Sequence, residues 1–377
     1  MKEIFKGIAF VFFVLAIVIV ICAGSNALAA SKKKVYEVTF MSVYPKLHSA
    51  MVTTTTFLDM VEESTNGRIK FKRYYSSQLA PARQALDATG KGIVDILYSY
   101  APYYAGKVAT GVMGFPGGWP NPTSWVYNFH NDPELRELIS KQYRERINVV
   151  LPLMHGLIPA SCFIMVPGKE IRKIEDFKGK TLRSPGGAVS DVLKELGAAT
   201  ITLIGGEWYT AMQRGTVDGV MGYSYALRSY KLIEVAGSIT RYPMVETTCP
   251  QLFVNADFWK NLPDDLKEAI IQVDKKWSWE VNLPVITKLE LDEWQAAKDK
   301  GVEIISLPKE DVEKIHEIAF RTGRENYLKL CRSQGYGEVG QKIMNKMIKA
   351  REEWPELEKK LLKEGKIKKG EYMYPSN

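Results

Sequence analysis

A tetrapeptide that occurs twice constrains the fold of this chain more than any other feature. Residues 92–95 (GIVD) are echoed by residues 215–218 (GTVD), and each copy follows a helical pattern that ends at a glycine and precedes a segment rich in tyrosine. Each copy predicts a short buried strand that delivers its tyrosines to the carboxyl edge of a sheet. Ligands bind at that edge in open α/β sheets. The echo therefore predicts two similar units that share one binding region.

Strand and helix patterns alternate along the rest of the chain. Short apolar runs bounded by turn residues predict strands, and capping residues and glycines mark the ends of helices. This order is typical of a doubly wound α/β fold. Strands are expected at residues 35–41, 68–71, 93–97, 147–154, 161–166, 180–183, 200–204, 217–221, 244–255 and 302–307, and helices at 49–63, 81–89, 187–197, 207–214 and 264–300, the last with a kink at Pro284.

Length and composition agree with two soluble domains. The chain has 377 residues, of which 46% are hydrophobic, so a disordered polymer, a disulfide-stapled miniprotein and a polytopic membrane protein are all excluded. The net charge of +8 comes from 51 basic and 43 acidic residues that alternate along the chain. Because no basic block stands out, we expect no nucleic-acid partner.

The first 30 residues predict an export signal. Lys2 and Lys6 precede an apolar run at residues 8–23, and small residues at 27–29 offer a cleavage site. The run is shorter than the roughly 18 to 20 residues that span a bilayer, which makes an uncleaved membrane anchor the weaker alternative. We expect an exported, periplasmic protein.

The cysteines and histidines predict neither a metal site nor a cofactor site. Cys162, Cys249 and Cys331 follow the signal, and there is no C-x-x-C motif among them. Buried thiols are favoured, and a bridge between Cys162 and Cys249 is the alternative. The four histidines have neither the helical spacing nor the neighbouring carboxylates of a zinc site.

Arg183 is the strongest candidate for binding an anion. It ends a predicted strand, and residues 184–187 (SPGG) open the next helix. A guanidinium beside exposed helix amides suits a carboxylate, because it donates two parallel hydrogen bonds and the helix dipole favours negative charge. Eight of the 19 tyrosines lie in or beside the repeated motif, where they can pack against an organic ligand and hydrogen-bond it. They are residues 98, 100, 103, 104, 209, 223, 225 and 230.

A secreted serine hydrolase that uses Ser224 is the alternative function. Residues 222–226 (GYSYA) lack the final glycine of a nucleophile elbow, and the pattern after the strand shows no clear helix start. There is no Walker loop and no G-x-G-x-x-G motif. We therefore expect a protein that is not an enzyme. A ligand-sensing domain would need a signalling module, and the chain shows none.

Six segments in a fixed order resemble the DctP-type substrate-binding proteins of TRAP transporters. They are residues 65–68 (TNGR), 78–79 (QL), 92–95 (GIVD), 171–183 (IRKIEDFKGKTLR), 196–198 (LGA) and 207–219 (EWYTAMQRGTVDG). The resemblance covers most of residues 35–330. It implies a two-domain periplasmic binding protein, type II-like, that closes around an organic acid and delivers it to small and large membrane permease subunits.

The resemblance also implies a division of the chain. We expect a signal peptide at 1–30, domain I at 31–160 plus 250–288, domain II at 161–249 plus 289–330, and a C-terminal helical extension at 331–377. Strands at 161–166 and 244–255 are the expected hinge crossings, and a long helix joins the domains.

In the family, the arginine that matches Arg183 clamps the ligand carboxylate. This chain departs from the family pattern at two places, which restricts the class of ligand expected. Residues 220–222 (VMG) replace polar family residues, and Phe163 stands where sialic-acid members carry a second arginine. This loss favours a small monocarboxylate over a sialic acid. The expected ligand-binding residues are Arg183, Tyr100, Tyr103, Trp119, Glu207, Tyr209 and Tyr223.

Overall fold

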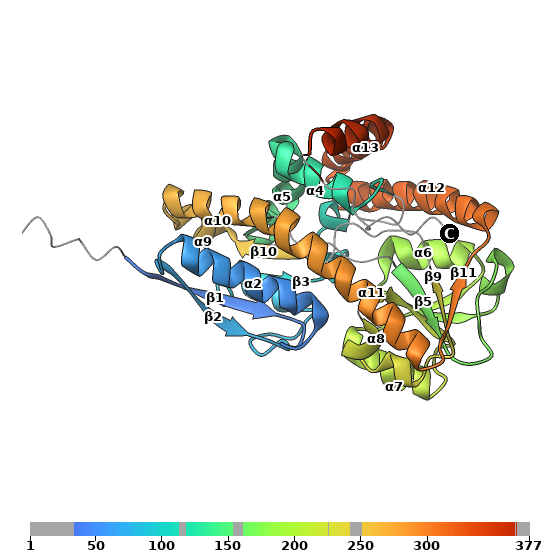
Figure 1. Ribbon diagram of the computed structural model, residues 1–377. Coiled ribbons are helices and arrows are strands. Elements are labelled where there is room, and N and C mark those ends of the chain that lie inside the picture. Colours follow the sequence, from blue (N-terminus) through green and yellow to red (C-terminus); the bar gives the residue numbers. More distant parts are fainter. Residues whose placement is uncertain are drawn as a thin grey trace, which may run out of the picture.

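The chain forms two β-sheets that lie side by side, each covered by its own helices (Figure 1). This computed structural model describes residues 34–112, 118–153, 161–224, 226–241, 251–365 and 367. The predicted export signal and Cys249 lie outside the described residues, as do parts of the strands expected at 147–154 and 244–255.

The first sheet has five strands and forms the centre of what we call the first lobe. Its order is β2 (Ile69–Tyr74), β1 (Tyr36–Ser42), β3 (Ile96–Ser99), β10 (Gln251–Asn255) and β4 (Val149–Val150). Strand β1 is parallel to β2 and β3, whereas β10 is antiparallel to both of its neighbours. The carboxyl ends of β1 and β3 therefore meet at one edge.

The second sheet has six strands and forms the centre of the second lobe. Its order is β11 (Glu303–Ser306), β9 (Ser238–Arg241), β5 (Ser161–Met165), β8 (Gly219–Tyr223), β6 (Thr181–Ser184) and β7 (Ala199–Thr202). Strand β6 is parallel to β7 and β8, and β5 is antiparallel to β8 and β9. Both sheets are thus mixed, since each contains one strand that runs against its parallel set.

Before residue 309, the chain passes between the lobes three times. It enters the second lobe between β4 and β5, returns between β9 and β10, and crosses again along α11 (Leu283–Asp299) to β11. Helix α11 contacts α2 of the first lobe and α8 of the second, as its course in Figure 1 indicates. The expected kink near Pro284 takes the form of a π-helical turn, Ser278–Asn282, that follows α10 (Asp264–Trp277). Proline lacks an amide hydrogen, so it fits best at the start of a new helix.

The helices of the first lobe include two that the sequence patterns did not predict. These are α4 (Pro122–Asn131) and α5 (Pro133–Ile147), which begin at prolines behind the capping side chains of Asn121 and Asp132. The Asn121 side chain accepts from the Ser124 amide and Asp132 accepts from the Leu135 amide. The other helices of this lobe are α2 (Ser49–Ser64), α3 (Ala85–Gly90) and α9 (Ala256–Asn261).

The second lobe has three short helices around its sheet. They are α6 (Gly187–Glu195), α7 (Trp208–Gln213) and α8 (Ala226–Ser229). Helix α6 begins where Gly186 adopts a positive φ of 98°, a conformation that favours glycine. The turn allows the chain to leave β6 and start the helix at once.

The predicted helical tail is present as two long helices. Helix α12 (Lys309–Ser333) packs on α6 of the second lobe, where Glu195 pairs with Arg321 and bonds Thr322. Its last turn reaches the first lobe, where Gln334 donates to the Ala105 carbonyl. Helix α13 (Gly337–Lys363) packs on α5 and α12. The predicted boundary between domain II and the C-terminal extension, at residue 330, falls inside α12. The predicted domain ranges stay a prediction.

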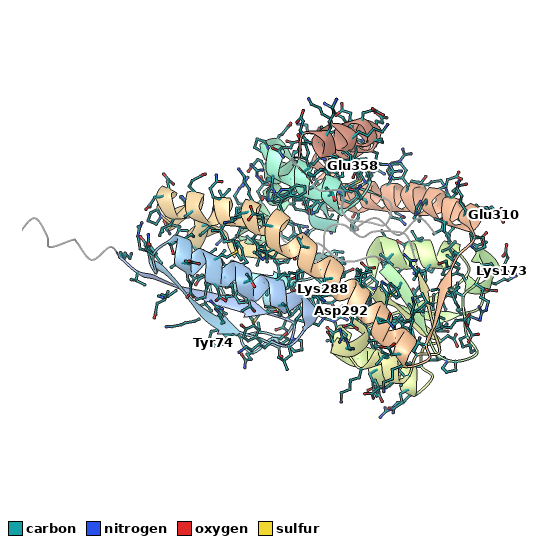
Figure 2. The ribbon with its side chains drawn as sticks, in the orientation of Figure 1. Tyr74, Lys173, Lys288, Asp292, Glu310 and Glu358 are labelled. Carbon is teal, nitrogen blue, oxygen red and sulfur yellow. The ribbon has the colours of Figure 1, made fainter. Side chains whose placement is uncertain are left out.

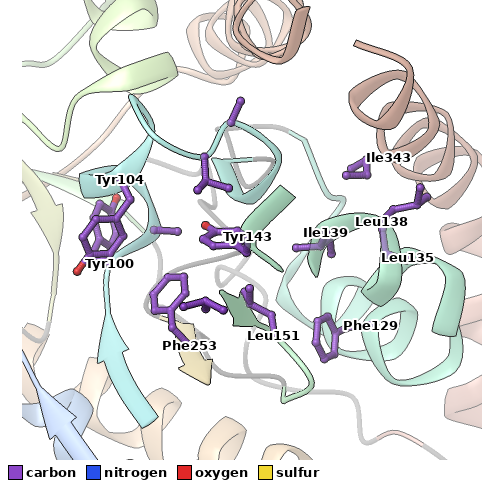
Figure 3. Packing of buried hydrophobic residues seen from close by; sticks show 14 of the residues in the cluster. Tyr100, Tyr104, Phe129, Leu135, Leu138, Ile139, Tyr143, Leu151, Phe253 and Ile343 are labelled. Carbon is purple, nitrogen blue, oxygen red and sulfur yellow. The ribbon is translucent and has the colours of Figure 1, made fainter. Parts of the chain in front are cut away.

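The core of the first lobe is built from aromatic side chains. Tyr143 of α5 lies 5.5 Å from Phe253 of β10, and Phe253 lies 5.7 Å from Tyr104, measured between ring centroids (Figure 3). Tyr104 also bonds Ser99 through its hydroxyl, at 2.7 Å. This packing holds the segment after β3 rigidly against the sheet.

The surface carries charges of both signs. Figure 2 shows Lys288 and Asp292 on an exposed face of α11, where they form an ion pair at 2.9 Å. Within the described part of the chain, every helix is too short or too polar to cross a bilayer.

Candidate ligand-binding site

A small cavity lies between the two lobes, at the carboxyl edges of both sheets. Its volume is about 20 Å³, close to the room that one water molecule needs. The first lobe contributes Tyr44, His48, Tyr100 and Tyr103, and the second contributes Arg183, Gly205, Trp208, Tyr223 and Tyr230. Aromatic rings thus surround a single guanidinium.

Arg183 is held by neutral partners. Its Nε donates to the Leu203 carbonyl at 2.9 Å and its Nη1 donates to the Met221 carbonyl at 2.8 Å. The guanidinium lies 4.0 Å from the ring centre of Trp208, and the residue is only 2% exposed. Strand β6 lies between β7 and β8, which places these two carbonyls on either side of it.

The charge of Arg183 is not neutralised within its lobe. Among the described residues, no carboxylate forms an ion pair with it, and it is the one charged side chain that lines the cavity. A buried cation without an anion costs free energy. The site is therefore electrostatically prepared for a small anion.

Two tyrosines connect the lobes directly. The hydroxyl groups of Tyr100, after β3, and Tyr223, at the end of β8, are 3.0 Å apart and hydrogen-bonded. The ring of Tyr103 lies 5.1 Å from that of Tyr100, edge to face. The lobes are therefore closed on each other in this structure, and the two rings occupy the centre of the cleft.

His48 makes a second contact across the cleft. Its ring lies 4.7 Å from Tyr44 in its own lobe and 5.2 Å from Tyr230 in the other. Burial lowers the pKa of His48 to about 3, so the imidazole is neutral at physiological pH. Burial likewise raises the pKa of Tyr230, which keeps its hydroxyl protonated.

The structure brings four of the seven predicted site residues together. Arg183, Tyr100, Tyr103 and Tyr223 all line the cavity. Tyr230 belongs to the tyrosine cluster that the sequence pattern indicated, whereas Tyr44, His48, Gly205 and Trp208 were not predicted as ligand contacts. The positions of Tyr44 and His48 could have indicated them, because both follow β1, whose carboxyl end lies beside that of β3.

The other three predicted residues have structural partners away from the cavity. Trp119 is buried against Trp125, with ring centres 5.1 Å apart. Glu207 is exposed, and its carboxylate accepts from the Ile204 amide at 2.8 Å. Tyr209 donates to the Glu234 carboxylate at 3.4 Å. These contacts cap a helical turn or stabilise packing within a lobe.

Ser224 is placed where it cannot meet a substrate. It is fully buried, and its hydroxyl has no hydrogen-bond partner among the residues that the structure describes. The expected lack of a helix after this strand was wrong, because α8 begins at Ala226. Cys162 and Cys331 are buried free thiols. Over the described ranges, no cluster of His, Cys, Asp and Glu side chains is suited to hold a metal ion.

Two α/β lobes that close on each other around a cavity define a bilobal binding protein. Bacterial extracellular solute-binding protein family 7, the DctP family, matches residues 40–329, and the chain belongs to this family. The resemblance inferred from the sequence motifs is therefore confirmed. Because the family consists of solute-binding proteins, the hydrolase alternative is wrong.

Individual relatives cover most of the chain. A monocarboxylate 2-oxoacid-binding periplasmic protein of Nostoc sp. is 25% identical over 297 residues, which are 75% of this chain and 77% of that protein. A TRAP periplasmic solute binding protein from Rhodoferax ferrireducens, with bound malonate, has a TM-score of 0.73 at 22% identity and covers 84% of this chain and 98% of its own.

A second Rhodoferax ferrireducens protein of this type, in complex with copurified benzoate, has a TM-score of 0.68 at 19% identity and covers 85% of this chain and 99% of its own. At this level of identity, the solved structures establish a shared two-lobed fold. The predicted fold class, with its helical tail, is confirmed.

Proposed function

We propose that this protein is the periplasmic component of a TRAP transporter and captures a monocarboxylate with Arg183 as its anchor. The observation that carries the proposal is the buried guanidinium, which faces a cavity with no described carboxylate to pair with it. Two of its nitrogens bond backbone carbonyls, which leaves Nη2 to donate to a ligand.

The lining of the cavity supports a ligand with one negative charge. Arg183 is its single cation among the described lining residues, and burial keeps His48 neutral. Phe163, at the position of the family's second arginine, packs 5.0 Å from Phe177 inside the second lobe. The relatives bind different acids, namely 2-oxoacids, malonate and benzoate, so the preference for one carboxylate rests on this chain's own residues.

Closure of the lobes is the proposed mechanism of capture. A ligand that contacts both lobes stabilises the closed form over the open form, since only the closed form brings both sets of contacts together. The small and large permease subunits then recognise the closed form and accept the ligand. Export by residues 1–30, with an uncleaved anchor as the alternative, belongs to the same proposal.

A thermal-shift panel on the purified protein from residue 31 onwards tests the ligand class. We expect one or a few monocarboxylates to raise the melting temperature, because they bind only the folded state. Neutral analogues in which an amide replaces the carboxylate should give no shift. A panel in which only neutral sugars raise the melting temperature would reject the proposal.

Calorimetry on Arg183→Ala tests the anchor. We expect affinity for the acid to fall by roughly 2 to 5 kcal/mol. Arg183→Lys keeps the charge but loses the fork, and should give a smaller loss. Arg214→Ala is the matched control, because Arg214 is exposed in the same lobe. Unchanged affinity in a folded Arg183→Ala variant excludes Arg183 as the anchor.

A further inference from the structure

Trp208 restrains the guanidinium of Arg183 in two ways. The guanidinium carbon lies over the indole ring, 4.0 Å from its centre, so the cation packs on the face of the indole. The indole N–H donates to the Leu203 carbonyl at 3.2 Å, and the same carbonyl accepts from Arg183 Nε at 2.9 Å. Together with the bond from Nη1 to the Met221 carbonyl, these contacts fix the position and the plane of the guanidinium.

The contact continues through two more rings into the other lobe. Tyr230 lies 5.2 Å from Trp208, and His48 of the first lobe lies 5.2 Å from Tyr230, measured between ring centres. These separations are typical of aromatic pairs that attract each other. We call Trp208, Tyr230 and His48 the aromatic row. Because His48 and Tyr230 belong to different lobes, closure of the cleft completes the row.

Two glycines leave space for the aromatic row. A Cβ added at Gly222 would lie 3.1 Å from the Trp208 ring, and one added at Gly205 would overlap the Tyr230 hydroxyl. Neither glycine has a positive φ, so the space that the rings need accounts for them better than backbone conformation does. The backbone of the second lobe is therefore fitted to these two rings.

A guanidinium that is held in one plane prefers planar anions. Its N–H groups donate within that plane, and a carboxylate has both of its oxygens and its carbon in one plane. A sulfonate carries the same charge but is tetrahedral, so its oxygens cannot all lie in the plane. An arginine that is free to rotate adapts to such an anion, whereas one fixed by two carbonyls and an indole face adapts poorly.

We propose that Trp208 is a positioning residue that makes the site select a planar carboxylate over a tetrahedral oxyanion of the same charge, and that Tyr230 and His48 support it when the lobes close. This inference rests on the proposed function, with Arg183 as the anchor, and adds a determinant of specificity. Trp208 acts on the ligand through Arg183.

Calorimetry with pairs of acids that differ only in the acidic group tests the selection. The pairs are propionate with ethanesulfonate and benzoate with benzenesulfonate. The parent protein should bind each carboxylate about tenfold more tightly than its sulfonate, and Trp208→Leu should reduce this ratio to about twofold, because the guanidinium loses its planar support. Trp208→Phe keeps an aromatic face and should restore most of the ratio. Trp294→Leu is the matched control, because Trp294 lies 6.0 Å from the Arg241 guanidinium in the second lobe, away from the cavity.

A double-mutant cycle tests the support that crosses the cleft. His48→Leu should lower the carboxylate-to-sulfonate ratio about twofold in the parent protein and leave it unchanged in Trp208→Leu, because the first lobe acts through Trp208. An equal decrease in both backgrounds would overturn the role of the aromatic row.

Hydrogen exchange at Arg183 Nε gives a readout that needs no ligand. NMR spectra of arginine side chains should show a slowly exchanging N–H that disappears in Arg183→Ala. We expect its exchange to accelerate about tenfold in Trp208→Leu and to change little in Trp208→Phe, because the phenyl ring still covers the guanidinium. Equal exchange in the parent protein and in Trp208→Leu would show that the indole does not hold Arg183.

The outcomes separate this inference from the proposed function. If Arg183→Ala leaves the affinity for carboxylates unchanged, both fail. If carboxylates bind through Arg183 and Trp208→Leu keeps the ratio of the parent protein, only this inference is overturned. If neither carboxylate binds, this inference is overturned and the thermal-shift panel decides the proposed function. Equal losses in Trp208→Phe and Trp208→Leu also overturn it, since the aromatic face then has no part in the selection.

Discussion

In the first lobe Asp95 exchanges two hydrogen bonds with Thr39, and in the second lobe Asp218 exchanges the same two with Thr181. The aspartate amides donate to the threonine carbonyls at 2.9 and 2.8 Å, and each carboxylate accepts from the threonine amide at 2.7 Å. Gly92 and Gly215 precede them with φ values of 74° and 68°. The repeated motif is therefore a structural device that ties the start of one strand to its neighbour.

The two aspartates differ in their electrostatic environment. Burial raises the pKa of Asp95, against the opposing hydrogen bonds from Thr39. Burial acts in the same direction on Asp218, but the Thr181 amide and the Lys169 ammonium, 3.0 Å away, outweigh it and lower the pKa. The same backbone contacts favour the charged carboxylate in both lobes, but burial outweighs them at Asp95, whereas Lys169 adds to them at Asp218.

The two lobes also correspond in the binding site, where a tyrosine follows each aspartate at the same spacing. Tyr100 and Tyr223 each follow their aspartate by five residues, and their hydroxyls bond each other across the cleft. The lobes differ in what surrounds this pair. The second lobe supplies a permanent cation, Arg183, and the first supplies a neutral imidazole, His48.

The largest expected effect comes from protonating the neutral imidazole of His48. The ordinary pKa of 6.5 applies to His48 in the unfolded chain, and the folded pKa is about 3. Between these values the unfolded state binds more protons, so the free energy of unfolding decreases as pH falls. Urea titrations should show a loss of about 2 kcal/mol between pH 7 and pH 5.

His48→Gln should remove most of this pH dependence. His316→Gln, on an exposed part of α12, is the control and should retain it. If His48→Gln and the parent protein lose stability in parallel as the pH falls, the imidazole is not kept neutral by the fold.

The paired aspartates give the next effect. Asp218→Asn should destabilise the protein by about 1 to 2 kcal/mol, because it removes a charge that the fold favours. Asp95→Asn should cost less than about 1 kcal/mol, because its charge is disfavoured and the amide oxygen still accepts from Thr39. Chemical denaturation at pH 7 measures both. Equal losses, or a larger loss at Asp95, would contradict the difference between the lobes.

The smallest effect concerns the tyrosine bridge. A double-mutant cycle with Tyr100→Phe and Tyr223→Phe should give a coupling energy of about 0.5 to 1.5 kcal/mol in thermal unfolding, the contribution of one hydrogen bond. Tyr209→Phe is the control, because its hydroxyl contacts Glu234 within the second lobe. No coupling between Tyr100 and Tyr223 would mean that the lobes close without this bond.

Sequence patterns were most informative where local rules decide the structure. Glycine-closed helices and apolar strands, such as Gly187–Glu195 after Thr181–Ser184, follow from capping and periodicity. Arg183 was recognisable because a strand end and a helix start flank it. The π-helical turn and the paired helices α4 and α5 were not recognised, although Asn121 and Asp132 are ordinary capping residues before proline.

The site was only partly predictable because side-chain direction depends on tertiary contacts. Glu207 and Tyr209 lie beside Trp208 in sequence, yet only Trp208 faces Arg183. Trp119 was predicted to bind the ligand, but it packs in the core of the first lobe. His48 came from a segment with no motif, and only the strand order shows that it reaches the second lobe.

The closed cleft has a kinetic consequence. A cavity of about 20 Å³ at Arg183, bridged by Tyr100 and Tyr223, offers no entry to an organic acid. Association must then wait for the lobes to separate, and the observed association rate should reach a plateau at high ligand concentration. The height of that plateau is the opening rate of the protein, so a stopped-flow measurement on the purified protein from residue 31 onwards reports the frequency of the motion.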